Sequence, residues 1–88
     1  MTVANKTDII NAVLEERDFQ DAKHQTSHHG MGTWLLLIES ELDEAKLAAV
    51  KGGSGRNSVR HELIQVAALC VAALEDHGLT SHNEGREV

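Results

Sequence analysis

The chain contains no proline, and most of its glycines lie in two short segments; these two features restrict its fold more than any others. Without proline, nothing forces a break in a long helix between the glycine segments. The glycines within 30–32 and 52–55 therefore divide the chain into three helical stretches. The alternation of apolar and polar residues that is typical of strands does not occur. We expect an all-α fold.

The predicted helices have residues at their ends that commonly start or stop helices. The expected boundaries, with possible caps included, are Thr7 to Lys23, Thr33 to Lys51, and Asn57 or Ser58 to Gly78. A loop at 24–32 joins the first two helices. We predict one helical domain over residues 1–79 and a flexible polar tail over 80–88.

The small size of the chain limits the core that it can form. Its 88 residues suffice for a single domain. Because Trp34 and Phe19 are the only aromatic residues, Leu, Ile, Val and Ala must supply most of the core. We expect the three helices to form an antiparallel helical bundle that is completed by dimerisation or tetramerisation.

Charge and composition exclude several classes of protein. A formal net charge of −6 argues against direct binding to nucleic acid. No apolar run approaches the roughly 20 residues of a membrane span, and the N-terminus is too polar for a signal peptide. Cys70 is the only cysteine, which rules out a disulfide framework. We expect a cytoplasmic protein, in a bacterial cell or in a phage-infected host.

Three glutamates fall on the apolar sides of the last two predicted helices. At about 100° per residue, Glu41 lies within an apolar arc of the second helix, and Glu44 lies on its border. Glu62 projects among apolar residues of the third helix. The arc of the second helix comprises Trp34, Leu37, Ile38, Leu42, Ala45, Ala48 and Ala49.

Carboxylates in such positions suggest a metal site. Burying them together is costly unless a cation holds them, and Mg²⁺ prefers carboxylate oxygens with waters and phosphates. Glu41 and Glu44, three residues apart, can reach one ion. Glu62 would add a ligand from the facing helix and Gln65 a neutral oxygen. Spacing alone is equally compatible with side chains at helix margins whose carboxylates lie in water; the apolar surroundings of Glu62 favour a site.

Two short motifs resemble a known signature. The segments Ser40–Glu44 (SELDE) and Glu62–Gln65 (ELIQ) are similar to the EExxE…ExxD pattern of the all-α nucleoside triphosphate pyrophosphohydrolases. Within that superfamily, the chain most resembles small MazG-like proteins of phages and bacteria, over about residues 15 to 77. The further shared residues are Glu16, Arg17, Gln20, Lys23, Trp34 and the segment His61 to Ala68.

The resemblance implies a dimeric helical bundle that cleaves an NTP or dNTP to NMP and pyrophosphate. Glu41, Glu44 and Glu62 would be the catalytic residues and the ligands of Mg²⁺, for which Mn²⁺ could substitute. Ser40 and Gln65 stand where the pattern has Glu and Asp, and Gln65 removes one negative ligand. A degenerate protein that only binds nucleotides is therefore a second possibility. The alternative is a noncatalytic helical interaction module, such as a phage accessory protein acting on a host partner.

Several other residues are candidates for contact with the substrate. Arg17, Gln20 and His24 continue an apolar face of the first helix that is formed by Ile9, Ile10, Val13 and Leu14. The second half of this helix either lines a polar cavity, with Arg17 and Lys23 in contact with phosphate, or leaves the core there. Gln20 would also lie on the substrate side. Trp34 could stack on a base, although packing is the favoured interpretation. Arg60 could meet phosphate, although a solvated helix start is favoured.

The histidines at 24, 28, 29 and 61 raise the possibility of zinc. We disfavour it, because no cysteine joins them and structural zinc usually takes four ligands. A polar loop near the nucleotide is the preferred interpretation of the histidines before the second helix.

Overall fold

The computed structural model describes residues 3–24, 28–52 and 58–79, which fold into three helices. They are α1 (Lys6–His24), α2 (Met31–Lys51) and α3 (Val59–His77). The described segments contain no strand, which confirms the all-α prediction. None of these helices combines the length and the apolar character that crossing a membrane requires. The predicted tail at 80–88 lies outside the described residues.

Two of the three predicted N-terminal caps are wrong. In α1, Asn5 rather than Thr7 supplies the cap, and its Oδ1 atom accepts a hydrogen bond from the backbone nitrogen of Asp8 at 2.8 Å. In α2, extended Gly30 precedes the first turn and offers no side chain, so Thr33 lies inside the helix. In α3, Ser58 is the cap as predicted, and its Oγ atom accepts from His61 N at 3.1 Å. Asn57 lies outside the described residues.

The C-terminal ends of the second and third helices agree with the prediction. α2 ends at Lys51 and is followed by Gly52 with φ 69°. α3 ends at His77 and is followed by Gly78 with φ 85°. Both glycines adopt positive φ, which costs other residues a steric penalty, and both donate a backbone hydrogen bond to the last turn.

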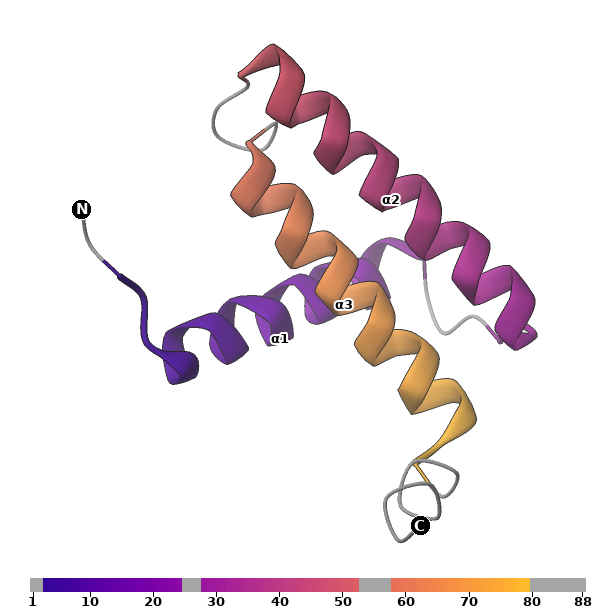
Figure 1. The fold of residues 1–88 in the computed structure, drawn as a ribbon. Helices are drawn as coiled ribbons and strands as arrows, with labels where there is room; N and C mark the ends of the chain where they lie inside the picture. The colour runs from indigo at the N-terminus through magenta and orange to yellow at the C-terminus, as the bar shows by residue number, and fades with distance from the viewer. Residues whose placement is uncertain (1–2, 25–27, 53–57, 80–88) are drawn as a thin grey trace, which may run out of the picture.

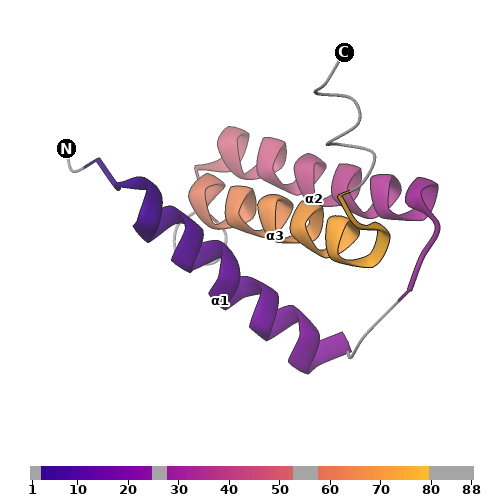
Figure 2. The ribbon, with the colours of Figure 1, turned by 90° about the horizontal axis from the view of Figure 1, so that it is seen from below.

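The central element of the fold is α3. Helices α2 and α3 lie side by side and run in opposite directions (Figure 1). Helix α1 slants across the pair and packs against α3 (Figure 2). Because α3 contacts both neighbours, side chains from all three helices can meet along it. The completion of this arrangement into a bundle by further chains stays a prediction.

The buried core is small and consists mainly of alanines. Trp34 of α2, only 6% exposed, packs against Ala72 and Ala73 of α3, with Leu69 beside them. Trp34 is therefore a packing residue, as favoured from the sequence. Alanines allow close approach of helices but bury little apolar area. The other buried apolar residues are Ala45, Ala48 and Ala68.

Most large apolar side chains remain outside this core. Among the described residues, no large side chain is fully buried. Leu37 and Leu42, which belong to the predicted apolar arc of α2, are exposed, so the arc is buried only in part. Leu36 and Val50 are 66% and 85% exposed. The apolar face predicted for α1 is also exposed at Ile9, Ile10 and Leu14. The single chain thus leaves much apolar surface in contact with water.

Candidate metal centre

The three glutamates singled out in the sequence converge in the structure. Glu41 and Glu44 lie one turn apart on α2, and Glu62 lies in the first turn of α3. Each offers a carboxylate oxygen, and these oxygens all lie within 4.8 Å of one another. Ser58 fixes where α3 begins, and the close packing of α3 on α2 brings Glu62 to the other two. We call these three residues the carboxylate cluster.

The carboxylate cluster is partly desolvated, and no described residue neutralises its charge. Glu62 is 7% exposed, Glu41 is partly buried and Glu44 is exposed. The pKa of Glu41 is raised to about 7, chiefly because burial removes water from its carboxyl group. The charges of Glu44 and Glu62 raise it further, as does a hydrogen bond to Glu62. Among the described residues, no Lys, Arg or His forms an ion pair with the cluster.

The spacing of the three oxygens fits a divalent cation. Oxygens bound to one Mg²⁺ lie about 2.1 Å from it, and so no more than about 4.2 Å from one another. The observed limit of 4.8 Å needs only a slight contraction of flexible glutamate side chains. Carboxylates held this close without a cation repel each other, so the donor set suits a hard divalent ion.

Gln65, one turn after Glu62, fills the role of a hydrogen-bond donor to the cluster. With its amide nitrogen turned toward the carboxylates, it donates to Glu62 Oε2 at 2.8 Å and to Glu41 Oε2 at 3.0 Å. These bonds compensate part of the negative charge. To serve as the predicted oxygen ligand, the Gln65 amide would have to turn over and exchange these donors for its oxygen.

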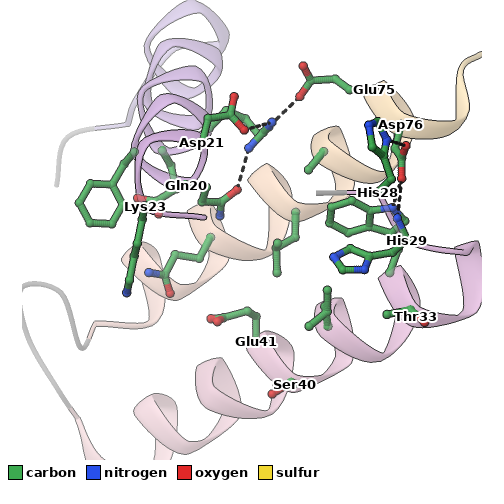
Figure 3. A pocket seen from close by; sticks show the side chains of 18 residues that line it. Gln20, Asp21, Lys23, His28, His29, Thr33, Ser40, Glu41, Glu75 and Asp76 are labelled. Carbon is green, nitrogen blue, oxygen red and sulfur yellow. Dashed lines mark hydrogen bonds and ion pairs between the residues drawn. The ribbon is translucent and has the colours of Figure 1, made fainter. Parts of the chain in front are cut away.

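A pocket of about 780 Å³ adjoins the carboxylate cluster (Figure 3). That volume lies within the ~300–1,000 Å³ common for small-molecule sites. Its walls come from the second half of α1, the first half of α2 and the part of α3 from Gln65 onward, together with His28 and His29 before α2. Glu41 lines the pocket, whereas Glu44 and Glu62 do not. Glu41 is thus the member of the cluster that borders the pocket.

The predicted phosphate-binding residues of α1 line this pocket, but Arg17 already has acidic partners. Its Nε and Nη2 atoms donate to Glu75 and Asp21 at 2.7 and 2.8 Å. Its Nη1 atom donates to Gln20 at 3.2 Å. Gln20 and Lys23 both project from α1 toward the pocket (Figure 3). A phosphate group would have to compete with Glu75 and Asp21 for Arg17.

The remaining candidates divide between the pocket and the surface. Trp34 and Ser40 line the pocket, although Trp34 is largely buried in the core. Arg60 is exposed near the start of α3 and does not line the pocket. The structure therefore does not bring Arg60 to the site and agrees with a solvated position.

Asp76, which sequence reasoning did not single out, organises the opposite wall of the pocket. Its Oδ1 atom accepts from His28 Nδ1 at 2.8 Å. Its Oδ2 atom accepts from Trp34 Nε1 at 2.8 Å and from the backbone nitrogen of His29 at 3.0 Å. These hydrogen bonds, with that from His28 first, hold the pKa of Asp76 well below its usual range. We call these four residues the Asp76 anchor.

The Asp76 anchor gives His28 and His29 a structural role in the segment before α2. The ring of His29 packs edge-on against Trp34, with centroids 4.9 Å apart. The backbone oxygen of His29 and His77 Nε2 lie 2.8 Å apart. The segment preceding α2 is thereby tied to the last turn of α3. No short-range sequence pattern indicates this, because the partners lie more than 40 residues apart.

Glu16 is a second residue that sequence reasoning did not list as a site residue. It is 8% exposed, although it carries a carboxylate, and it lines the pocket together with Glu41. Its negative charge contributes to raising the pKa of Glu41. A signal was present in the sequence, since the neighbours one turn away on either side are uncharged. They are Ala12, Val13, Phe19 and Gln20.

Comparison of the chain with protein-family models, with curated proteins and with solved structures gave no match. Membership of the MazG-like superfamily therefore stays a prediction from the sequence motifs. The carboxylate cluster and the adjoining pocket are features of this chain itself.

Proposed function

We propose that the chain is a Mg²⁺-dependent nucleotide pyrophosphohydrolase that cleaves an NTP or dNTP to NMP and pyrophosphate. The observation that carries this proposal is the convergence of Glu41, Glu44 and Glu62 to within 4.8 Å beside a pocket of about 780 Å³. The MazG-like motifs, which contain these same three residues, give the reaction class. Mn²⁺ would replace Mg²⁺ in the same set of oxygen ligands.

In this proposal, one set of residues binds the cation and another binds the phosphates. Glu41, Glu44 and Glu62 would hold the cation, which when bound neutralises phosphate charge and polarises the phosphoryl oxygens. Lys23 would meet the phosphates from α1 as a point charge. Arg17 would also bind phosphate through two hydrogen bonds, after releasing one of its acidic partners. Trp34 would form part of the wall of the pocket rather than stack freely on the base.

The charges around the pocket support a requirement for the cation. Among the described residues, the lining contains five acidic residues and only Arg17 and Lys23 as fixed positive charges. Such a pocket repels a polyphosphate unless cations accompany it. The acidic residues of the lining are Glu16, Asp21, Glu41, Glu75 and Asp76.

Because of Gln65, a second form of the proposal is a protein that binds nucleotides without hydrolysing them efficiently. Gln65 contributes no charge where the MazG-like pattern has Asp, so the cation would be held less tightly. A protein of this kind would still bind a nucleotide with its cation.

The test is a pyrophosphate-release assay with Mg²⁺ across the common NTPs and dNTPs. We expect release by the wild-type chain and a loss of about 100-fold or more in Glu41→Ala, because a group that stabilises developing charge is removed. Glu39→Ala, an exposed glutamate on the same helix, is the matched control and should retain activity. Absence of release from every nucleotide, or equal rates in Glu41→Ala, would contradict the proposal. Nucleotide binding without release would support the variant that only binds.

We also propose that the working form is a homodimer or homotetramer in the cytoplasm. The exposed apolar residues of α2, among them Leu35, Leu36 and Leu47, support an association that covers them. Analytical ultracentrifugation of the purified chain tests this, and a strictly monomeric species at micromolar concentration would contradict it. A monomer that captures a different protein would instead favour the interaction module.

A further inference from the structure

We propose that Glu75 competes with phosphate for Arg17 and thereby sets how tightly a nucleotide binds in the pocket. In the chain without a ligand, the Glu75 carboxylate occupies the place of a phosphate group on the guanidinium. A bound nucleotide displaces this carboxylate into water. This role rests on the proposed function, in which Arg17 binds phosphate after releasing an acidic partner.

Every nitrogen of the Arg17 guanidinium has a partner (Figure 3). Nε donates to Glu75 Oε1 at 2.7 Å, Nη2 to Asp21 Oδ1 at 2.8 Å and Nη1 to Gln20 Oε1 at 3.2 Å. The Arg17 side chain is 12% exposed, and all three partners line the same pocket as Arg17 itself. A bidentate contact with phosphate that includes Nε therefore requires Glu75 to leave.

Glu75, rather than Asp21, is the partner that a phosphate would replace. Nε carries a single N–H group, which Glu75 occupies, whereas Nη2 carries two and can keep Asp21 while it also bonds phosphate. Asp21 lies one turn after Arg17 on α1 and stays beside it wherever that helix moves. Glu75 reaches Arg17 from α3, and its side chain is 58% exposed, so water can solvate the displaced carboxylate.

The neighbour of Glu75 keeps it at the pocket. Asp76 is 12% exposed and accepts hydrogen bonds from His28, His29 and Trp34, which fix the last turn of α3. Among the described residues, Glu75 accepts from Arg17 alone. The backbone of Glu75 is thus held in place while its carboxylate has a single bond to exchange.

The chemistry of the guanidinium favours the exchange when a polyphosphate arrives. The planar fork of Arg17 matches carboxylate and phosphate equally well in shape, but a phosphate group carries more negative charge and more acceptor oxygens. An ion pair with an exposed carboxylate stabilises a protein only modestly, so the bond to Glu75 is reversible. The ligand class is the phosphate chain of a nucleoside triphosphate that enters with its cation.

The same ion pair also joins two helices. Among the ion pairs of the described residues, that between Arg17 and Glu75 is the one that connects α1 to another helix. Loss of the Glu75 charge should therefore lower stability slightly while it raises affinity for the nucleotide. A pair with a purely structural role predicts instead that affinity falls together with stability.

The experiment is isothermal titration calorimetry with the α,β-imido analogues of the common dNTPs in excess Mg²⁺. We expect Glu75→Gln to bind about two- to fivefold more tightly than the wild type, the range set by an exposed ion pair. In an Arg17→Ala background, Glu75→Gln should leave the affinity unchanged. Asp18→Asn, which removes an exposed charge beside Arg17 that does not line the pocket, is the matched control and should bind as the wild type does. Thermal melts of the chains without ligand should show a slightly lower Tm in Glu75→Gln.

The outcomes separate this role of Glu75 from the proposed function. Binding by the wild type with equal or weaker binding by Glu75→Gln would overturn the competition and leave the proposed function intact. A gain in affinity that persists in the Arg17→Ala background, or that Asp18→Asn reproduces, would show a general effect of charge and would also overturn it. Absence of binding in both the wild type and Glu75→Gln would overturn both proposals.

Discussion

The carboxylate cluster and the Asp76 anchor lie at opposite ends of α3, and they shift the pKa values of their acidic side chains in opposite directions. In the Asp76 anchor, one carboxylate accepts hydrogen bonds from His28, His29 and Trp34, and its pKa is lowered. In the carboxylate cluster, three carboxylates face one another, and the pKa of Glu41 is raised to about 7. The anchor is electrostatically complete within the chain, whereas the cluster is not.

This difference separates a structural acid from a candidate functional one. A carboxylate surrounded by donors stabilises the fold in which those donors are positioned. Carboxylates that surround each other destabilise the fold until a proton or a cation reaches them. The cluster therefore lowers the stability of the folded chain, and a bound divalent cation would restore it.

The largest expected effect is the loss of the core at the Asp76 anchor. Trp34→Ala removes the one large buried side chain of α2 and the indole donor to Asp76. Substitutions of buried Trp by Ala cost about 3–5 kcal/mol, which approaches the total stability of a small domain. Chemical denaturation followed by circular dichroism measures the change. Val50→Ala, at an exposed position, should change stability by less than about 0.5 kcal/mol.

Asp76→Asn is expected to have the next largest effect. The amide keeps one acceptor oxygen but directs an NH₂ group at donors, so the bonds to His28, His29 or Trp34 cannot all be kept. Since the pKa of Asp76 is lowered by folding, its contribution is present above the ordinary aspartate pKa and is lost as pH falls below it. Thermal melts across acidic pH should show a lower Tm and a weaker acid dependence in Asp76→Asn. An unchanged acid dependence would mean that the anchor does not stabilise the fold.

Glu41→Gln should shift stability in the other direction. Between the ordinary pKa of 4.5 and the raised value of about 7, the folded chain binds more protons than the unfolded chain. In a chelator, stability should therefore fall as pH rises through this interval. Glu41→Gln should flatten this fall and gain about 1 kcal/mol above pH 7, a modest value because water screens a partly exposed group. A metal-free wild type that becomes more stable from pH 5 to 7 would contradict the account of the cluster.

Gln65→Asp should change the stability of the metal-free chain least, and it tests the role of charge in binding the cation. The substitution removes the donor that bonds Glu41 and Glu62 and adds a carboxylate at the cluster. We expect a slightly less stable metal-free chain and a tighter site for Mg²⁺, by about tenfold or 1.4 kcal/mol. Isothermal titration calorimetry with Mg²⁺ measures the affinity. Weaker binding in Gln65→Asp would show that Gln65 is itself a required ligand.

Local patterns in the sequence predict the helices and the members of the carboxylate cluster. The absence of proline, the cap at Ser58 and the glycines at 52 and 78 act within a turn or two of their positions. Helical periodicity likewise places Glu41, Glu44 and Glu62 on faces that meet when two helices pack.

Contacts between residues far apart in the sequence could not be predicted from local patterns. α2 begins at Met31 rather than at Thr33, and the segment before it is bonded to Asp76, more than 40 residues away. The burial of Glu16 depends on how α1 crosses the other helices, which helical periodicity within α1 does not specify. The prediction for Arg17 was incomplete for the same reason: its partner Glu75 lies 58 residues further along the chain.

The most direct test of the central claim is the thermal stability of the chain with and without Mn²⁺ at pH 8, where Glu41 is deprotonated. A cation at 100 times its Kd stabilises the folded state by about 2.7 kcal/mol. We predict a rise in Tm for the wild type that Glu62→Gln abolishes and Glu39→Gln retains. A wild-type Tm that does not respond to Mn²⁺, or an equal rise in Glu62→Gln, would contradict the claim that the carboxylate cluster binds a cation.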